Sequence, residues 1–516
     1  MAVKPFVNEP LIDFQDPDNR AQMHAALERV QAVLGRKWPI WIGDQAVSTA
    51  STIASLNPSH PDQVVGYVAK ASRVEIDRAV EAAWQAFADW KRLPGPVRAR
   101  YLYKAAAIMR RRRLELAAWE VIEAGKPWSE ADADVAEAID FLEYYGRQME
   151  RLSQPIPIDP IAGEDDQAFY IPLGVGAIIP PWNFPLAILT GMTVAAVVAG
   201  NTVVLKPSSD TPVVASQFFT ILQEAGFPPG VVNFLPGEGG EVGDYLVSHP
   251  RIRFVSFTGS REVGLRIHRL AAELMPGQRW IKRVIAEMGG KDAIIVDETA
   301  DLDAAAEGIV VSAFGFSGQK CSACSRAILL DAVHDPLLER IRKLAERLRV
   351  GPAEEYESQM GPVINQRAER KILEYIAWGK DHATLVTGGE KLSGEGYFIQ
   401  PTIFAEVLPG SKIEQEEIFG PVLSVIRARD WEEAMTIAND TEYGLTGAVY
   451  TRRRDRIEDA RQRFEVGNLY INRKCTGAMV GAHPFGGFNL SGTNSKTGSP
   501  DYLLLLMQVK SVAERL

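Results

Sequence analysis

The chain has 516 residues, of which 46% are hydrophobic and 24% charged, with 56 Lys and Arg against 66 Asp and Glu. That length corresponds to roughly three or four domain-sized units, each large enough to bury a core. The composition argues against a largely disordered chain and against a collagen or disulfide scaffold. The net charge of −10 disfavours nucleic acid and anionic membrane surfaces as partners.

The N-terminal part of the chain predicts an irregular arm followed by helices. Val80, Ala83 and Phe87 recur at three- and four-residue spacing, which places them on one face of a helix. The run RRRR at 110–113 is interpreted as a solvated helix face rather than a nucleic-acid patch. Three amphipathic helices are predicted, over residues 76–90, 96–124 and 129–152.

Strands and helices then alternate, which indicates a parallel sheet with helices on both faces. Such a sheet binds ligands beyond the carboxyl ends of its strands, most often nucleotides. A second alternating unit starts near Lys291 with the run DAIIV, passes through a helix near 303–325 and continues to about 470. The strands predicted in the first unit are 174–180, 201–207, 231–237 and 254–260, with helices at 186–200 and 211–226 between them.

Two further segments stand outside these units. The Pro-rich stretch 153–166 predicts a projecting hairpin or loop, and 503–513 predicts a strand. The uncharged stretch 167–205 has only 186–200 as an unbroken apolar helix, short of the ~20 residues that span a bilayer. With no secretory signal and three cysteines, we expect a reduced protein in the cytoplasm, with no membrane partner.

Cys321, in FSGQKCSACSR (316–326), is a candidate nucleophile, because an ionised thiol is strongly nucleophilic and small neighbours admit a substrate. A buried, inert thiol is the common alternative. Cys324 follows at the spacing of a redox or zinc pair, but no second pair completes a four-ligand site. We predict no metal.

Two other motifs carry polar side chains at predicted strand ends. Glu287, in AEMGGK, could act as a general base on water, or it could be an ordinary surface carboxylate. Asn183, in PPWNFP, is held in a stiff turn from which its amide could donate to an oxyanion, although proline-rich turns are common. Ser260, in FTGS, could cap a helix whose free N–H groups bind phosphate, or could be only a cap.

The motifs occur in a fixed order: GVGAIIPPWNFP, VVLKPS, FVSFTGS, AEMGGK, GQKC, QEEIFGPV and HPFGGFNLSG. In this order and spacing the chain resembles the aldehyde dehydrogenase superfamily along nearly its whole length. The resemblance implies an α/β fold with a Rossmann-type cofactor domain, an α/β catalytic domain and a small oligomerisation element. The implied limits are 1–152 and 170–287 for the cofactor domain, 288–474 for the catalytic domain, and 153–169 with 485–516 for oligomerisation.

The resemblance also implies a mechanism. The Cys321 thiolate would attack the aldehyde carbon, and the oxyanion would be held by the Cys321 N–H and the Asn183 amide. Hydride would then leave for a nicotinamide, and Glu287 would activate the water that hydrolyses the thioester.

The cofactor that the resemblance implies is NAD. Many strictly NAD-using relatives have Glu where this chain has Ser209, a carboxylate that would repel a 2′-phosphate. Because Ser209 is neutral and Lys206 is close in sequence, we expect NADP to be tolerated as well. The implied cofactor-binding residues are Lys206, Ser209, Gly259, Ser260, Trp182, Glu417 and Phe419.

Within the superfamily, CSACSR, NRKCTGAMVGAHPFGG and SGTNSKTG are most similar to the branch that oxidises L-glutamate γ-semialdehyde, which equilibrates with 1-pyrroline-5-carboxylate, to L-glutamate in proline degradation. That branch implies an anchor for the substrate carboxylate at Gly477 and Ala478, assisted by Ser322. Phe184 and Phe485 would enclose the aliphatic chain.

Alternatives remain open at this stage. Another semialdehyde could be the substrate, the enzyme could transfer its acyl group to coenzyme A, or the fold could serve a non-catalytic binding protein. We expect a homo-oligomer, a dimer or a hexamer, and a monofunctional enzyme, since no proline dehydrogenase-like segment precedes it. Cys324 could also form a protective disulfide with Cys321 under oxidants.

Overall fold

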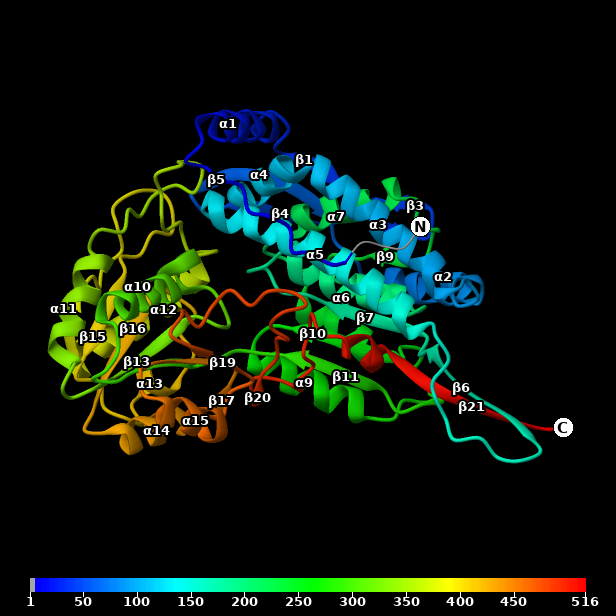
Figure 1. Cartoon of the computed structure of the whole chain (residues 1–516). Coiled ribbons are helices and arrows are strands. Elements are labelled where there is room, and N and C mark those ends of the chain that lie inside the picture. Colours follow the sequence, from blue (N-terminus) through cyan, green and yellow to red (C-terminus); the bar gives the residue numbers. More distant parts are fainter. Residues whose placement is uncertain (1–4) are drawn as a thin grey trace.

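A computed structural model describes residues 5–516 of the chain. Two α/β halves lie side by side, and a long hairpin projects from one of them (Figure 1). The α/β class predicted from the sequence is confirmed.

The first half is built on a seven-stranded sheet with parallel central strands. Every residue of β7 and β8 is buried, because hydrophobic clusters lie on both faces. The four strands predicted in this part of the chain are confirmed. In order across the sheet the strands are β11 (Arg283–Glu287), β10 (Phe254–Thr258), β7 (Val175–Ile179), β8 (Thr202–Leu205), β9 (Val232–Phe234), β2 (Ile40–Ile42) and β3 (Gln45–Val47).

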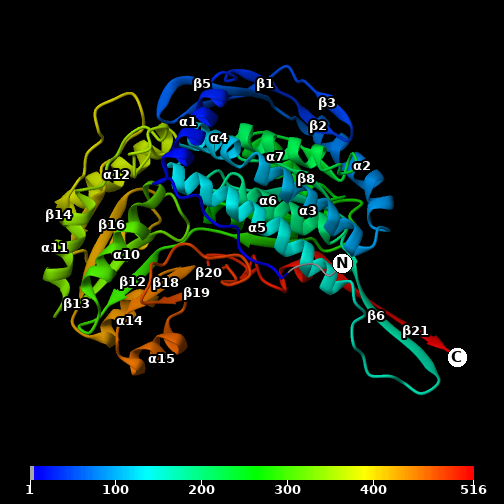
Figure 2. The same ribbon diagram turned by 45° about the horizontal axis from the view of Figure 1, so that its top comes forward.

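Helices and a small sheet surround these strands (Figure 2). The three-stranded sheet contains β1 (Arg36–Trp38), β5 (His60–Ala69) and β4 (Thr52–Asn57). The helix α2 begins with a capping box between Ser72 and Glu75, which satisfies N–H groups that the first turn leaves free. The helices are α1 (Pro17–Gln31), α2 (Arg73–Trp90), α3 (Gly95–Arg111), α4 (Arg113–Ala124), α5 (Trp128–Leu152), α6 (Ala187–Val198), α7 (Pro212–Glu224), α8 (Asp244–Ser248) and α9 (Arg261–Ala272).

The prediction of one helix over 96–124 is wrong, because the chain breaks between α3 and α4 at Arg112, with φ −102° and ψ 13°. The arginine run lies at this junction and is paired with carboxylates. Arg110 binds Glu9 and Glu143, and Arg112 binds Glu224. The interpretation of this run as a plain solvated helix face therefore needs correction.

The second half has its own seven-stranded, mostly parallel sheet and its own core. The strands in order are β14 (Thr384–Thr387), β15 (Thr402–Ala405), β16 (Val422–Ala428), β13 (Cys324–Leu330), β12 (Asp292–Val296), β18 (Thr446–Tyr450) and β19 (Asn468–Ile471). The helices are α10 (Leu302–Phe314), α11 (His334–Ala345), α12 (Gln366–His382), α13 (Lys412–Gln415), α14 (Trp431–Asn439) and α15 (Arg454–Arg463).

The hairpin pairs β6 (Glu164–Pro172) with β21 (Met507–Arg515), two segments far apart in sequence (Figure 1). It leaves the apolar side chains of Phe169, Val509 and Val512 exposed. Residues 485–497, which come before β21 in the chain, are not part of the hairpin and contact Glu287. They contain the short strand β20 (Phe488–Asn489), which pairs with β17 (Tyr443–Gly444). Within residues 5–516, no helix combines the length and apolar character needed to cross a membrane.

Candidate active site

Four parallel strands of the first sheet deliver side chains to one edge. Trp182 and Asn183 follow β7, Lys206 and Ser209 follow β8, Gly259 and Ser260 follow β10, and Glu287 ends β11. Because the carboxyl ends of parallel strands meet at one edge of a sheet, these residues are brought close together. All but Glu287 line a cleft of about 860 Å³ at that edge.

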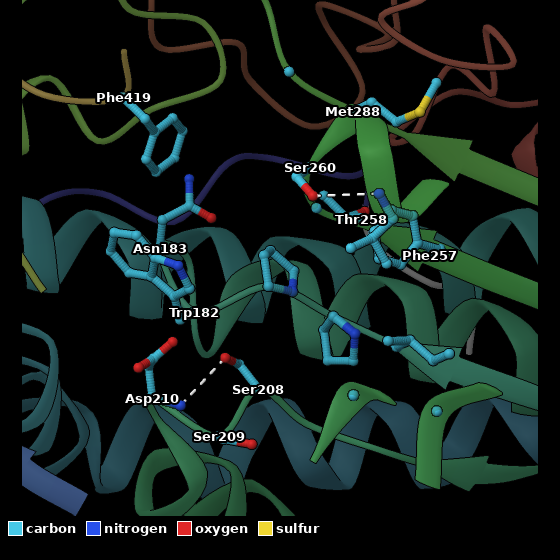
Figure 3. A pocket seen from close by; sticks show the side chains of 18 of the residues that line it. Trp182, Asn183, Ser208, Ser209, Asp210, Phe257, Thr258, Ser260, Met288 and Phe419 are labelled. Carbon is cyan, nitrogen blue, oxygen red and sulfur yellow. Dashed lines mark hydrogen bonds between the residues drawn. The ribbon is translucent and has the colours of Figure 1, made fainter. Parts of the chain in front are cut away.

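The second half closes the same cleft. Cys321 precedes β13, and Glu417 and Phe419 precede β16, so these residues come from the amino ends of their strands. The Phe419 ring packs edge-on against Trp182, with centroids 5.6 Å apart, beside Asn183 (Figure 3). The structure thus brings together Cys321, Asn183 and the seven residues predicted to bind cofactor.

Cys321 lies in a sharp turn, not in a helix. The predicted helix over 303–325 is wrong at its end, because α10 stops at Phe314. Phe316, Ser317 and Gly318 then take positive φ angles, which breaks the helix. A Cβ at Gly318 would lie 2.3 Å from the Gly420 carbonyl oxygen, so this turn requires glycine.

The Cys321 thiol is half-buried and free. Burial raises its pKa above the ordinary value, and the nearby carboxyl groups of Asp292, Glu417 and Glu287 raise it further. The thiol is therefore neutral at rest, and it must lose its proton before it can act as a nucleophile.

Asn183 is buried and tied to the turn that carries Cys321. Its Nδ2 donates to the carbonyl oxygen of Gln319 at 3.1 Å. Because an amide nitrogen has two N–H groups, this bond leaves one of them for a ligand. The side chain of Gln319 is held in turn, since its Oε1 accepts from the Ile364 N–H at 2.9 Å.

Glu287 is buried at the end of β11. Its carboxylate accepts from the Ser495 hydroxyl at 2.6 Å, from the Ser495 N–H at 3.2 Å and from the Gly487 N–H at 3.3 Å. Burial raises the pKa of Glu287 to about 7, although these donors and Lys496 oppose the rise. A carboxyl group with this pKa suits proton transfer at neutral pH.

The residues predicted to bind substrate lie outside the lining of this cleft. The Ser322 carbonyl oxygen accepts from the Cys475 thiol at 3.4 Å, so the loop that continues to Gly477 and Ala478 adjoins the nucleophile turn. Gly477 has φ +75°. Phe184 and Phe485 are both half-buried.

Lys126 is a residue that the sequence analysis missed. It is fully buried, and its ammonium lies 4.3 Å from the centre of the Phe184 ring. It forms ion pairs with Glu120, at 3.4 Å, and with Asp134. Asp134 also accepts from the Ala187 N–H at 2.6 Å, which fixes the chain just after Asn183 and Phe184. Lys126 lies between α4 and α5, and its partners Glu120 and Asp134 come from these two neighbouring helices, so the pairing depends on how the helices pack and not on a recognised motif.

Cys324 begins β13 and is buried. Burial raises the pKa of the Cys324 thiol, and its interaction with the Cys475 thiol raises that pKa further. Both Cys321 and Cys324 are free thiols, and their pairing under oxidants stays a prediction.

The cleft has the features that a dinucleotide needs. The buried Lys206 ammonium lies in it with the Pro207 carbonyl as its hydrogen-bond partner, at 3.1 Å, and burial lowers its pKa to about 8. Ser260 caps α9 by accepting from the Val263 N–H at 3.4 Å, so the positive end of that helix faces the cleft (Figure 3). Ser209 is half-buried, and its hydroxyl donates to the Gly237 carbonyl oxygen at 3.3 Å.

Comparison with known proteins gives consistent matches. A model described as the aldehyde dehydrogenase family matches residues 45–512. A curated protein called 1-pyrroline-5-carboxylate dehydrogenase, from Geobacillus thermodenitrificans, is 58% identical over 512 residues, which cover 99% of each chain.

Solved structures are similar over the whole chain. A crystal structure of 1-pyrroline-5-carboxylate dehydrogenase from Thermus with bound NAD matches with a TM-score of 0.99 and 59% identity, over 100% of both chains. Proline utilization A from Bdellovibrio bacteriovorus matches with a TM-score of 0.98 and 47% identity. That match covers 100% of this chain and 54% of the longer protein.

Proposed function

The chain belongs to the aldehyde dehydrogenase family, and we propose that it oxidises L-glutamate γ-semialdehyde to L-glutamate with NAD. The observation that carries this proposal is the meeting of Cys321 and Asn183 in a cleft built for a dinucleotide, with Glu287 beside it. The names of the relatives identify the substrate class.

In the first step the Cys321 sulfur forms a bond to the aldehyde carbon. The thiol proton must leave first, and Glu287, whose carboxylate is close enough to affect the pKa of Cys321, is the base that can take it. The carbonyl oxygen becomes an oxyanion, which the free N–H of Asn183 and the Cys321 backbone N–H stabilise. The buried hydrogen bond from Asn183 to the Gln319 carbonyl oxygen keeps this donor in place before the reaction.

The chemistry that bound NAD would supply is a hydride acceptor beside Cys321. Lys206 and Ser209 would hold its adenosine part, and Gly259 and Ser260 its pyrophosphate. Glu417, Trp182 and Phe419 would hold its nicotinamide end, and Glu417 is already fixed there by the Gly290 N–H at 3.2 Å.

The remaining thioester is hydrolysed by water. Glu287 first releases the thiol proton to solvent and is charged again. It then removes a proton from the water as the water oxygen bonds to the acyl carbon, and the C–S bond breaks to release the Cys321 thiolate and the carboxylic acid. A pKa of about 7 keeps much of Glu287 charged at neutral pH, as this role requires.

The substrate would extend from Cys321 toward the loop 475–478. Backbone N–H groups at Gly477 and Ala478, with the Ser322 hydroxyl, would bind its α-carboxylate. Phe184 and Phe485 would enclose its aliphatic chain. The contact of Cys475 with Ser322 supports this arrangement, because it keeps the loop beside the nucleophile.

Self-association and location are further proposals. The exposed apolar residues of the β6–β21 hairpin, which include Phe169, Val509 and Val512, support assembly into a homo-oligomer, a dimer or a hexamer. A cytoplasmic location stays a prediction.

The activity is tested by the rise in absorbance at 340 nm when the protein is mixed with pyrroline-5-carboxylate and NAD. We expect turnover without coenzyme A, and a higher kcat/KM than for succinic or aminoadipic semialdehyde. Faster oxidation of another semialdehyde, or a requirement for coenzyme A, would contradict the proposal.

A further inference from the structure

The donors to Glu287 come from one segment of the chain, residues 485–498. Its carboxylate accepts the Ser495 hydroxyl and N–H on Oε1, and the Gly487 N–H on Oε2. The O–H···O distance of 2.6 Å is typical of a hydrogen bond to a charged carboxylate.

This segment is itself firmly held. Phe485 and Thr497 exchange two backbone hydrogen bonds, at 2.9 and 2.7 Å. The Gly498 N–H donates to the Tyr145 hydroxyl at 2.8 Å, and the Lys496 ammonium donates to the Gly467 and Gly486 carbonyls at 2.6 and 2.8 Å. The Ser495 hydroxyl is thus presented from a fixed backbone.

Two glycines let the segment close around the carboxylate. A Cβ at Gly486 would lie 3.0 Å from Glu287 Oε1, and a Cβ at Gly492 would lie 3.1 Å from Oε2. Gly492 also has φ +156° and its Cβ would meet the Ala286 carbonyl oxygen at 2.6 Å. The backbone therefore packs closely around the carboxylate, and Ser495 supplies a side-chain hydrogen-bond donor to it.

We propose that Ser495 is a positioning residue for the general base: its hydroxyl holds the Glu287 carboxylate in place and in its charged form for hydrolysis of the thioester. This inference rests on the proposed acyl-enzyme chemistry. It also gives a role to the SGTNSKTG motif, which the mechanism leaves unused.

Ser495 opposes the effect of burial on Glu287. Burial favours the neutral acid, whereas the Ser495 hydroxyl and N–H and the Gly487 N–H favour the carboxylate. The titratable or charged groups that face Glu287 are Lys496, Cys321 and Tyr502. A hydrogen bond to a charged group contributes about one pKa unit or more, so its loss would raise the pKa of Glu287 by that amount.

The Ser495→Ala variant tests this role. We expect the acid limb of thioester hydrolysis to move up by about one pH unit. At pH values below this limb we expect a burst of NADH that approaches one per active site, because the acyl-enzyme accumulates. Hydroxylamine should release the acyl group from the enzyme. Ser495→Thr keeps the hydroxyl and should restore the original limb. Ser499→Ala, which removes another buried serine of the same region, should leave the limb unchanged.

A purely structural role predicts a different result. Ser495→Ala would then lower the rate equally at all pH values, with no burst, and that outcome would overturn the proposal. Alkylation of Cys321 by iodoacetamide across the same pH range separates ionisation of the thiol from that of Glu287. The pH dependence and the burst are also measured with p-nitrophenyl acetate, where released p-nitrophenolate replaces NADH as the readout. Because hydrolysis of this ester needs no NAD and no semialdehyde, the test is independent of the proposed substrate.

Discussion

The two halves of the molecule build one site from opposite ends of their strands. The first half places residues after the carboxyl ends of β7, β8, β10 and β11. The second half places Cys321 and Glu417 before the amino ends of β13 and β16. The first half follows the general rule for ligand sites in parallel α/β sheets, and the second half does not.

This difference separates two kinds of residue. The residues near the reacting atoms are buried or tied to buried partners, as Asn183 is to Gln319 and Glu287 to Ser495. At the other end of the cleft, Ser209 is half-buried and Glu238 is exposed. Substitutions should therefore cost most at the nucleophile turn and least at the adenosine end.

The largest effect is expected for Cys321→Ser. Loss of the thiolate removes the covalent step, so kcat for aldehyde oxidation should fall by roughly 10³-fold or more. The variant should still bind NAD, and this binding can be measured by the quenching of tryptophan fluorescence. Cys324→Ala is the matched control and should remain active. An active Cys321→Ser variant would remove the basis of the proposed chemistry.

Asn183→Ala should come next. Removal of one oxyanion donor costs about 3 kcal/mol, which corresponds to about a hundredfold loss of kcat. Asn183→Asp has the same shape but lacks the N–H groups, and it should be as slow. Unchanged kcat in both variants would show that Asn183 does not stabilise the oxyanion.

Lys126→Met tests the support behind Phe184. The change leaves Asp134 buried without its cation, so the free energy of unfolding should fall by about 3–5 kcal/mol, measured in urea. Arg342→Met, which breaks only exposed ion pairs, should leave the stability unchanged. In the Lys126→Met variant KM for the semialdehyde should rise as well, if Phe184 contacts the substrate.

The smallest effect is expected at Ser209. Ser209→Glu places a carboxylate where a 2′-phosphate would lie, so kcat/KM with NADP should fall by about tenfold while that with NAD is kept. Ser209→Gln has the same length without the charge and should still accept NADP. A preference of the wild-type chain for NAD above a thousandfold would contradict the predicted tolerance of NADP.

Local patterns predicted much of this protein. Apolar spacing located α2 and α5, and the short β-rich runs located β7, β8, β9 and β10. Where the prediction was wrong, the cause was a backbone feature: the break at Arg112, and the positive φ angles at Phe316 and Ser317. Neither Phe nor Ser favours such angles. Gly315, which directly follows Phe314, is a residue typical of helix ends, and the prediction overlooked this signal for the early end of α10.

The candidate site was only partly predictable. Motif order predicted Cys321, Asn183 and Glu287 as the reacting groups, and the structure places Cys321 and Asn183 in one cleft with Glu287 close to Cys321. Their catalytic roles stay a prediction. The roles of Lys126 and Ser495 were not predicted. Ser495 meets Glu287 from 208 residues away in the chain. Lys126 meets Glu120 and Asp134 only because α4 and α5 pack around it.

By itself, then, the amino-acid sequence determined the α/β class, the order of the strands along the chain and which residues are proposed as the reacting groups. These follow from residue type and from short-range periodicity, which local interactions decide. Only the tertiary structure decided which carboxylate meets which donor, how far each side chain is removed from water, and hence whether Cys321 and Glu287 are charged at rest. Protonation of a buried group depends on every polar neighbour that the fold brings around it. Local sequence patterns do not show which residues these neighbours are.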